Sequence, residues 1–97
     1  FYMYSNEEIA LVKRSEALAR RLDECFSYYR EYNIICGEMY DAILDLSILK
    51  NELHNPVNTR EKEVSNYVDY MIDIVSNRLS KPFYSIVRDK KIERILI

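Results

Sequence analysis

Apolar side chains recur through the first half of the chain at spacings that alternate between four and three residues. Only Ser15 and Lys50 in this series are neither apolar nor aromatic. A repeat sustained over so many heptads is typical of a long amphipathic helix of the coiled-coil kind. The series consists of Leu11, Ser15, Leu18, Leu22, Cys25, Tyr29, Tyr32, Cys36, Met39, Ile43, Leu46, Lys50 and Leu53.

The residues beside this repeat differ from those of a two-stranded coiled coil. They are largely apolar or aromatic, and include Phe26, Tyr28, Ile35, Tyr40, Ala42 and Leu49. Such a wide apolar stripe predicts a helix with two or more neighbours, as in a bundle. The opposite side carries an acid at every seventh residue, which indicates a solvated face; this acidic row is Glu24, Glu31, Glu38, Asp45 and Glu52.

The first helix is expected to cover residues 6–53, starting at a capping box in which Ser5 and Glu8 satisfy each other's backbone amides. An unbroken helix of that length would be about 72 Å long, whereas a compact domain of this size has a radius of gyration of about 13 Å. Asn33 and Gly37 are the only breakers available. Because the heptad register passes through 33–37 without a slip, we favour a continuous or kinked helix over one broken there.

Two further helices are expected. Asn55-Pro56 ends the first helix, and Asn58 with Glu61 forms a second capping box before a helix at about 59–79 that returns antiparallel to the first. Pro82 suits the start of a shorter helix at about 82–94. With one Gly and two Pro, an all-β fold is excluded for lack of turn residues. We therefore predict an all-α elongated hairpin or small helical bundle.

The chain is expected to be a single all-helical domain over residues 1–97. Because it begins with Phe1 and not Met, we expect it to be a fragment of a longer protein. Cys25 and Cys36 would lie about 16 Å apart on one continuous helix, too far for a disulfide. They are interpreted as small buried apolar side chains in an intracellular, reducing compartment, cytoplasmic or nuclear.

Polar clusters give no support for catalysis or metal binding. Glu38, Asp41 and Asp45 share a helix face with Glu31, but divalent metals need ligands from facing elements as well. His54 stands where the first helical stretch ends, where it can interact with exposed backbone carbonyls. We predict no catalytic residues, no metal and no cofactor, and the chain is not expected to be an enzyme.

Charge is distributed unevenly although the net charge is only −2. Residues 23–52 carry seven acids and two bases, whereas residues 78–94 carry six bases and two acids. Such a basic segment could contact phosphates, an anionic membrane or an acidic surface of another protein. The membrane is the least favoured of these, and the basic residues in question are Arg78, Lys81, Arg88, Lys90, Lys91 and Arg94.

The leading hypothesis is a non-enzymatic protein–protein interaction or oligomerisation module, with a homodimer favoured over a different protein partner. The chain has nine tyrosines and no tryptophan, and tyrosine is enriched at interfaces. The alternative is a nucleic-acid-binding accessory domain that uses the basic segment 78–94. The residues predicted for the protein interface are Tyr28, Tyr29, Tyr32, Ile35, Met39 and Tyr40.

Overall fold

The computed structural model describes the backbone of residues 5–96 and the side chains of residues 5–89. The described chain forms four helices and no strand: α1 (Asn6–Tyr32), α2 (Gly37–Glu52), α3 (Thr59–Leu79) and α4 (Phe83–Leu96). The prediction of a small all-α bundle is therefore confirmed. The third and fourth helices match the expected ranges closely.

The preference for a continuous first helix is wrong, because the chain turns between Tyr32 and Gly37. Asn33 adopts the left-handed conformation (φ 57°), and its amide donates to the Tyr29 carbonyl at 2.7 Å. Asparagine is one of the few residues that tolerates this geometry at a helix end. Cys36 is extended and serves as the N-cap of α2, while Gly37 has no positive φ. Asn33, and not the glycine, makes the break.

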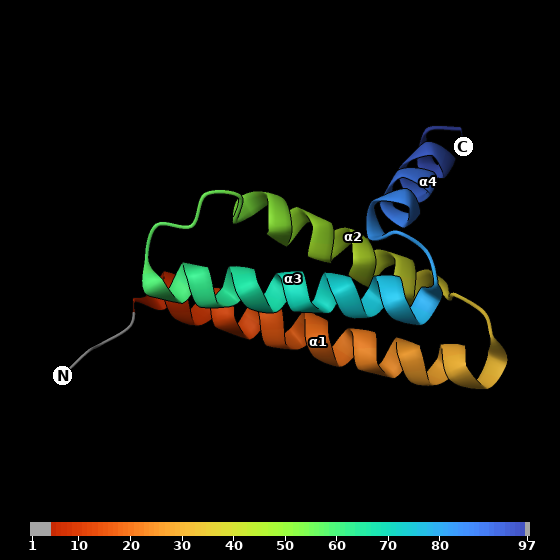
Figure 1. Ribbon diagram of the computed structural model, residues 1–97, viewed down its shortest axis with the longest axis horizontal. Coiled ribbons are helices and arrows are strands. Elements are labelled where there is room, and N and C mark those ends of the chain that lie inside the picture. Colours follow the sequence, from red (N-terminus) through yellow and green to blue (C-terminus); the bar gives the residue numbers. More distant parts are fainter. Residues whose placement is uncertain (1–4, 97) are drawn as a thin grey trace.

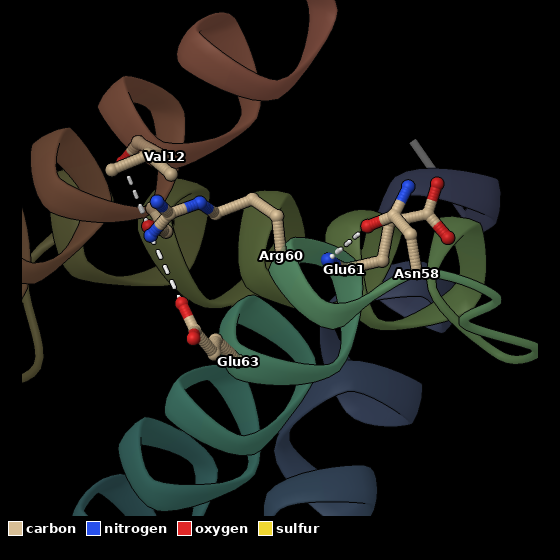
Figure 2. Close-up of polar contacts among 6 residues, drawn as sticks. Val12, Asn58, Arg60, Glu61 and Glu63 are labelled. Atoms are coloured by element: carbon tan, nitrogen blue, oxygen red, sulfur yellow. Dashed lines mark hydrogen bonds and ion pairs between the residues drawn. The ribbon is translucent and has the colours of Figure 1, made fainter. Parts of the chain in front are cut away.

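The predicted caps hold at the starts of α1 and α3. Ser5 Oγ accepts from the Glu8 amide at 3.1 Å, although the described residues include no reciprocal bond from Ser5 to Glu8. Asn58 Oδ1 accepts from the Glu61 amide at 2.8 Å (Figure 2). The Glu61 carboxylate in turn accepts from the Val57 amide. These bonds satisfy amides that helix geometry leaves without partners.

Helices α1, α2 and α3 lie side by side, each reversing the direction of the one before it (Figure 1). As a result α3 runs antiparallel to α2, as expected of a return, but parallel to α1. The break shortens the molecule: the described chain measures 48 × 29 × 21 Å, with a radius of gyration of 14.6 Å. In place of the expected single helix of about 72 Å, the structure has two shorter helices, α1 and α2, packed side by side.

The core lies between the three long helices, and the predicted heptad positions supply much of it. Leu18 and Leu22 in α1 are buried together with Met39, Ile43 and Leu46 in α2. The heptad pattern therefore identified the inward face of each piece correctly. From α3 the core receives Val64, Val68, Met71, Ile72, Val75 and Leu79.

Ion pairs fix the antiparallel alignment of α1 and α2. Arg14 pairs with Glu52, and Arg21 pairs with Asp45 at 2.7 Å. From the first pair to the second, the residue number rises by seven in α1 and falls by seven in α2, as expected for antiparallel helices. The C-terminal part of the acidic row thus faces basic residues of α1 within the same chain. Exposed pairs of this kind contribute at most about 1 kcal/mol each, so they select the register more than they stabilise the fold.

Helix α4 projects away from the long axis of the bundle (Figure 1). Phe83, Ile86 and Val87 are buried and form the apolar face of this helix. Among the described residues, α4 contacts α2 and α3 but not α1. The side of the bundle formed by α1 and α3 is therefore left without a covering helix.

Ser80 provides a test of the junction between α3 and α4. It ends α3 with φ 54°, and its amide donates to the Ser76 carbonyl. A serine in this conformation pays a steric cost that glycine avoids, so Ser80→Gly is expected to raise the free energy of unfolding by about 1 kcal/mol. Urea denaturation would measure the change, with Asn33→Gly as a control expected to gain less. A Ser80→Gly variant less stable than wild type would contradict the assigned geometry.

Candidate interaction groove between α1 and α3

Three surface hollows follow one another along α1 and α3 on the uncovered side of the bundle, and we call them together the α1–α3 groove. Helix α1 contributes one wall and α3 the other, and the floor is made by buried apolar residues of both. Because α1 and α3 are parallel, the groove has two distinct ends. Its central lining is Ala19, Leu22, Asp23 and Phe26 from α1, with Tyr67, Tyr70, Met71, Ile74 and Arg78 from α3.

Two tyrosines of α3 dominate the rim of the groove. Tyr67 and Tyr70 are one turn apart, and their rings stack with centroids 6.5 Å apart and an interplanar angle of 17°. They are 37% and 61% exposed. Large aromatic rings held against each other lose little conformational entropy on binding and offer both apolar faces and hydroxyl groups. They are the most prominent potential anchors in the groove.

The end of the groove nearest the C-termini of α1 and α3 is basic. Arg78 lies over the Phe26 ring, with its guanidinium carbon 4.7 Å from the ring centroid. Arg30 and Tyr29 line the same hollow. No acidic residue lines this hollow, although Asp23 lies one turn before Phe26 in the groove centre. Two arginines are thus available to an acidic group from outside.

The other end of the groove carries exposed carboxylates. Glu16 lines the hollow beside Arg60, and Glu63 accepts from Arg60 at 2.9 Å. Arg60 extends from α3 towards Val12 in α1 (Figure 2), and Lys13 lies at this end too. This end therefore mixes both signs of charge, whereas the described residues that line the opposite hollow include two arginines and no carboxylate.

The two ends are symmetrically placed about the tyrosines. Glu16 and Arg30 are fourteen residues apart in α1, about 21 Å along the axis. Glu63 and Arg78 are fifteen residues apart in α3, about 22 Å. The midpoints fall at Asp23 and next to Tyr70, both of which line the groove centre. Acidic and basic groups are thus about equally far from one central point.

The residues predicted for an interface do not share one surface. Met39 is fully buried in the core. Tyr29, Ile35 and Tyr40 are partly buried and pack against the core. Tyr28 and Tyr32 are exposed and contact each other, with ring centroids 4.6 Å apart. Of the six, only Tyr29 reaches the α1–α3 groove.

Sequence reasoning missed Phe26, Tyr67 and Tyr70 as one group. Tyr67 and Tyr70 stand between the inward positions of α3, on a face with no role in its core, and this was a usable signal. Phe26 was seen only as a flank of the heptad repeat. No pattern in the sequence indicates that these three residues line one groove, because their placement depends on the order in which the helices pack.

The predicted phosphate-contacting residues are dispersed. Arg78 belongs to the α1–α3 groove, and Lys81 is exposed in the connection after α3. Arg88 lies 3.7 Å from the Asp89 carboxylate. The side chains of Lys90, Lys91 and Arg94 lie outside the described residues.

Within the described part of the chain, no three metal-binding side chains cluster. Of the carboxylates considered for metal binding, Asp45 pairs with Arg21. His54 Nδ1 lies 2.9 Å from the Asn51 carbonyl, which confirms its predicted interaction at the end of a helix. None of the described helices combines the length and apolar character needed to cross a membrane. Comparison of the chain with protein-family models, curated proteins and solved structures finds no match.

Proposed function

We propose that this chain is a non-enzymatic protein–protein interaction module that dimerises through the α1–α3 groove. The observation that carries the proposal is the aromatic and arginine lining of the groove on the side that α4 leaves uncovered. Tyrosine and arginine are the residue types that most often dominate binding energy at protein interfaces. The occupant we propose is a second copy of the same chain.

Helix geometry supports a twofold arrangement. A parallel pair of helices can pack against an identical pair rotated by 180°, which gives a four-helix layer. With the axis near Asp23 and Tyr70, the Tyr70 rings of both protomers would lie close to the centre of the interface. Central, desolvated aromatic residues are where hot spots concentrate.

Charge complementarity supports the same arrangement. A twofold rotation about the groove centre places the basic end of one protomer, with Arg30 and Arg78, over the acidic groups of the other, Glu16 and Glu63. Two such contacts are formed in each dimer because the interface is isologous. Complementary charges of this kind fix orientation and exclude partners of the wrong sign.

Tyr70→Ala tests the proposal against a matched control. Removal of a central aromatic anchor is expected to cost about 2 kcal/mol or more, and hence to raise the dimer dissociation constant about 30-fold or more. The control is Tyr84→Ala, since Tyr84 in α4 is 60% exposed, close to the 61% of Tyr70, but does not line the groove. Sedimentation velocity at several concentrations would give both constants. Equal effects of the two substitutions would contradict a groove-centred interface.

A further inference from the structure

The turn between α1 and α2 brings the two cysteines of the chain together. Cys25 in α1 and Cys36 at the start of α2 line one surface pocket, together with Glu24, Tyr28, Gly37 and Glu38. Both thiols are free in the structure. The separation of about 16 Å that excluded a disulfide on a continuous helix therefore does not apply to the folded chain.

The two thiols have different surroundings. Cys25 is 5% exposed and belongs to the core, whereas Cys36 is partly buried and packs against it. Cys36 is the N-cap residue of α2, and its partial exposure leaves its sulfur more open to a reagent from solvent than that of Cys25. It also ends the connection 33–36, whose backbone can adjust more easily than a helix when a new bond forms.

The environment of Cys25 makes its thiol hard to ionise. Burial, together with the charge and hydrogen bonding of the neighbouring Cys36 side chain, raises the pKa of the Cys25 thiol from 9.0 to about 11. Glu38 also raises this pKa, while Arg21 lowers it. Cys25 is therefore protonated at neutral pH and is a poor first nucleophile.

We propose that Cys25 and Cys36 are a disulfide-forming pair that reacts with hydroperoxides, with Cys36 as the thiol oxidised first and Cys25 as the resolving thiol. In the first step the Cys36 thiolate attacks the terminal peroxide oxygen and the O–O bond breaks. The leaving alkoxide or hydroxide takes up from solvent the proton that the Cys36 thiol had released, and departs as an alcohol or water. Cys36 becomes a sulfenic acid, oxidised by two electrons. In the second step Cys25 sulfur attacks Cys36 sulfur, the S–O bond breaks, and water leaves with the Cys25 proton.

The product joins α1 covalently to the start of α2 across the turn that contains Asn33. The pocket lies between α1 and α2, and none of its lining residues lines the α1–α3 groove. The proposal therefore does not depend on dimerisation, and a monomeric chain would leave it intact.

The test uses the fully reduced chain treated with hydrogen peroxide at neutral pH and then alkylated. Intact mass and a non-reducing peptide map are expected to show loss of two hydrogen atoms and a bond between Cys25 and Cys36 of the same molecule. In Cys25→Ser, the sulfenic acid of Cys36 is expected to accumulate and be trapped by dimedone. In Cys36→Ser, the remaining thiol is expected to react at least about tenfold more slowly than Cys36 does in Cys25→Ser.

Three results would overturn the proposal. The first is treated wild-type protein that contains no disulfide between Cys25 and Cys36 of the same molecule, whether its two thiols are oxidised separately or remain free. The second is a disulfide that forms only between molecules. The third is a Cys36→Ser variant that reacts as fast as Cys25→Ser. Circular dichroism of each variant would establish that the serine forms retain the helical fold. If serine at the buried position 25 disrupts the fold, Cys25→Ala replaces Cys25→Ser.

Discussion

Met39→Ala is expected to lower the free energy of unfolding by about 2–5 kcal/mol, the range observed when a large buried side chain is truncated to alanine. Met39 has no exposed surface, and it packs in the cluster formed by α1, α2 and α3. The loss combines transfer of the thioether chain to water with the cavity left behind. For a domain of this size such a loss is a large fraction of the total stability.

The control for Met39 lies on the same helix. Ile48 is 50% exposed, so Ile48→Ala is expected to change the free energy of unfolding by no more than about 0.5 kcal/mol. Urea denaturation followed by circular dichroism would compare the two variants at one protein concentration, because dimerisation adds to apparent stability. If Met39→Ala weakened dimerisation while leaving the unfolding of the monomer unchanged, its assignment to the core would be refuted.

Charge reversal at the basic end of the groove is expected to weaken self-association strongly. Arg30→Glu with Arg78→Glu places glutamates opposite Glu16 and Glu63 of the other protomer, so these contacts of the twofold dimer change from attractive to repulsive. Juxtaposed like charges cost several kcal/mol, and a decrease in affinity of at least about tenfold is expected at low salt. Because exposed charges are screened, high salt should restore part of the affinity. The residual aromatic contacts would then dominate.

A second double variant turns this result into a test of orientation. Glu16→Arg with Glu63→Arg makes both ends basic and is expected to be monomeric as well. Mixing the two variants should restore a one-to-one heterodimer, because each acidic end then meets a basic end in both contacts. Size-exclusion chromatography of each variant alone and of the mixture would show this. A mixture that remains monomeric while each variant keeps the wild-type circular dichroism spectrum would contradict the twofold arrangement.

Local chemistry in the sequence predicts much of the fold. Asn58, Pro56 and Pro82 mark the ends of helices through their backbone preferences, and these preferences act within a few residues. The heptad pattern likewise gives the buried face of each helix. These parts could be predicted because the deciding interactions are close in sequence.

The turn at 33–36 could not be predicted in this way. The inward positions of α1 end at Cys25 and those of α2 begin at Met39, and a connection of this length happens to preserve the heptad register across the gap. A register that continues is compatible with either a straight helix or a hairpin. The choice is made by the burial gained when α2 folds back on α1, which is a tertiary effect, while Asn33 only permits the turn.

The same limit applies to both proposed sites. Phe26 and Tyr67 line one groove, and Cys25 and Cys36 line one pocket, only after the turn has set the order of the helices. The sequence shows the residue types that the two sites use, but only the tyrosines suggested an interface, whereas the two cysteines were interpreted as small buried apolar side chains. Their grouping depends on which helix faces remain uncovered, and that depends on the direction taken by α4.

The mass of the wild-type chain in solution is the most direct test of the proposed dimer, because the proposed function depends on self-association through one face. Sedimentation equilibrium would be measured from low micromolar to submillimolar concentration in reducing buffer, so that no intermolecular disulfide contributes. For a dimer, we expect the mass to rise reversibly with concentration from 11.7 kDa to twice that value, without larger species. A mass of 11.7 kDa at every concentration would contradict dimerisation through the α1–α3 groove.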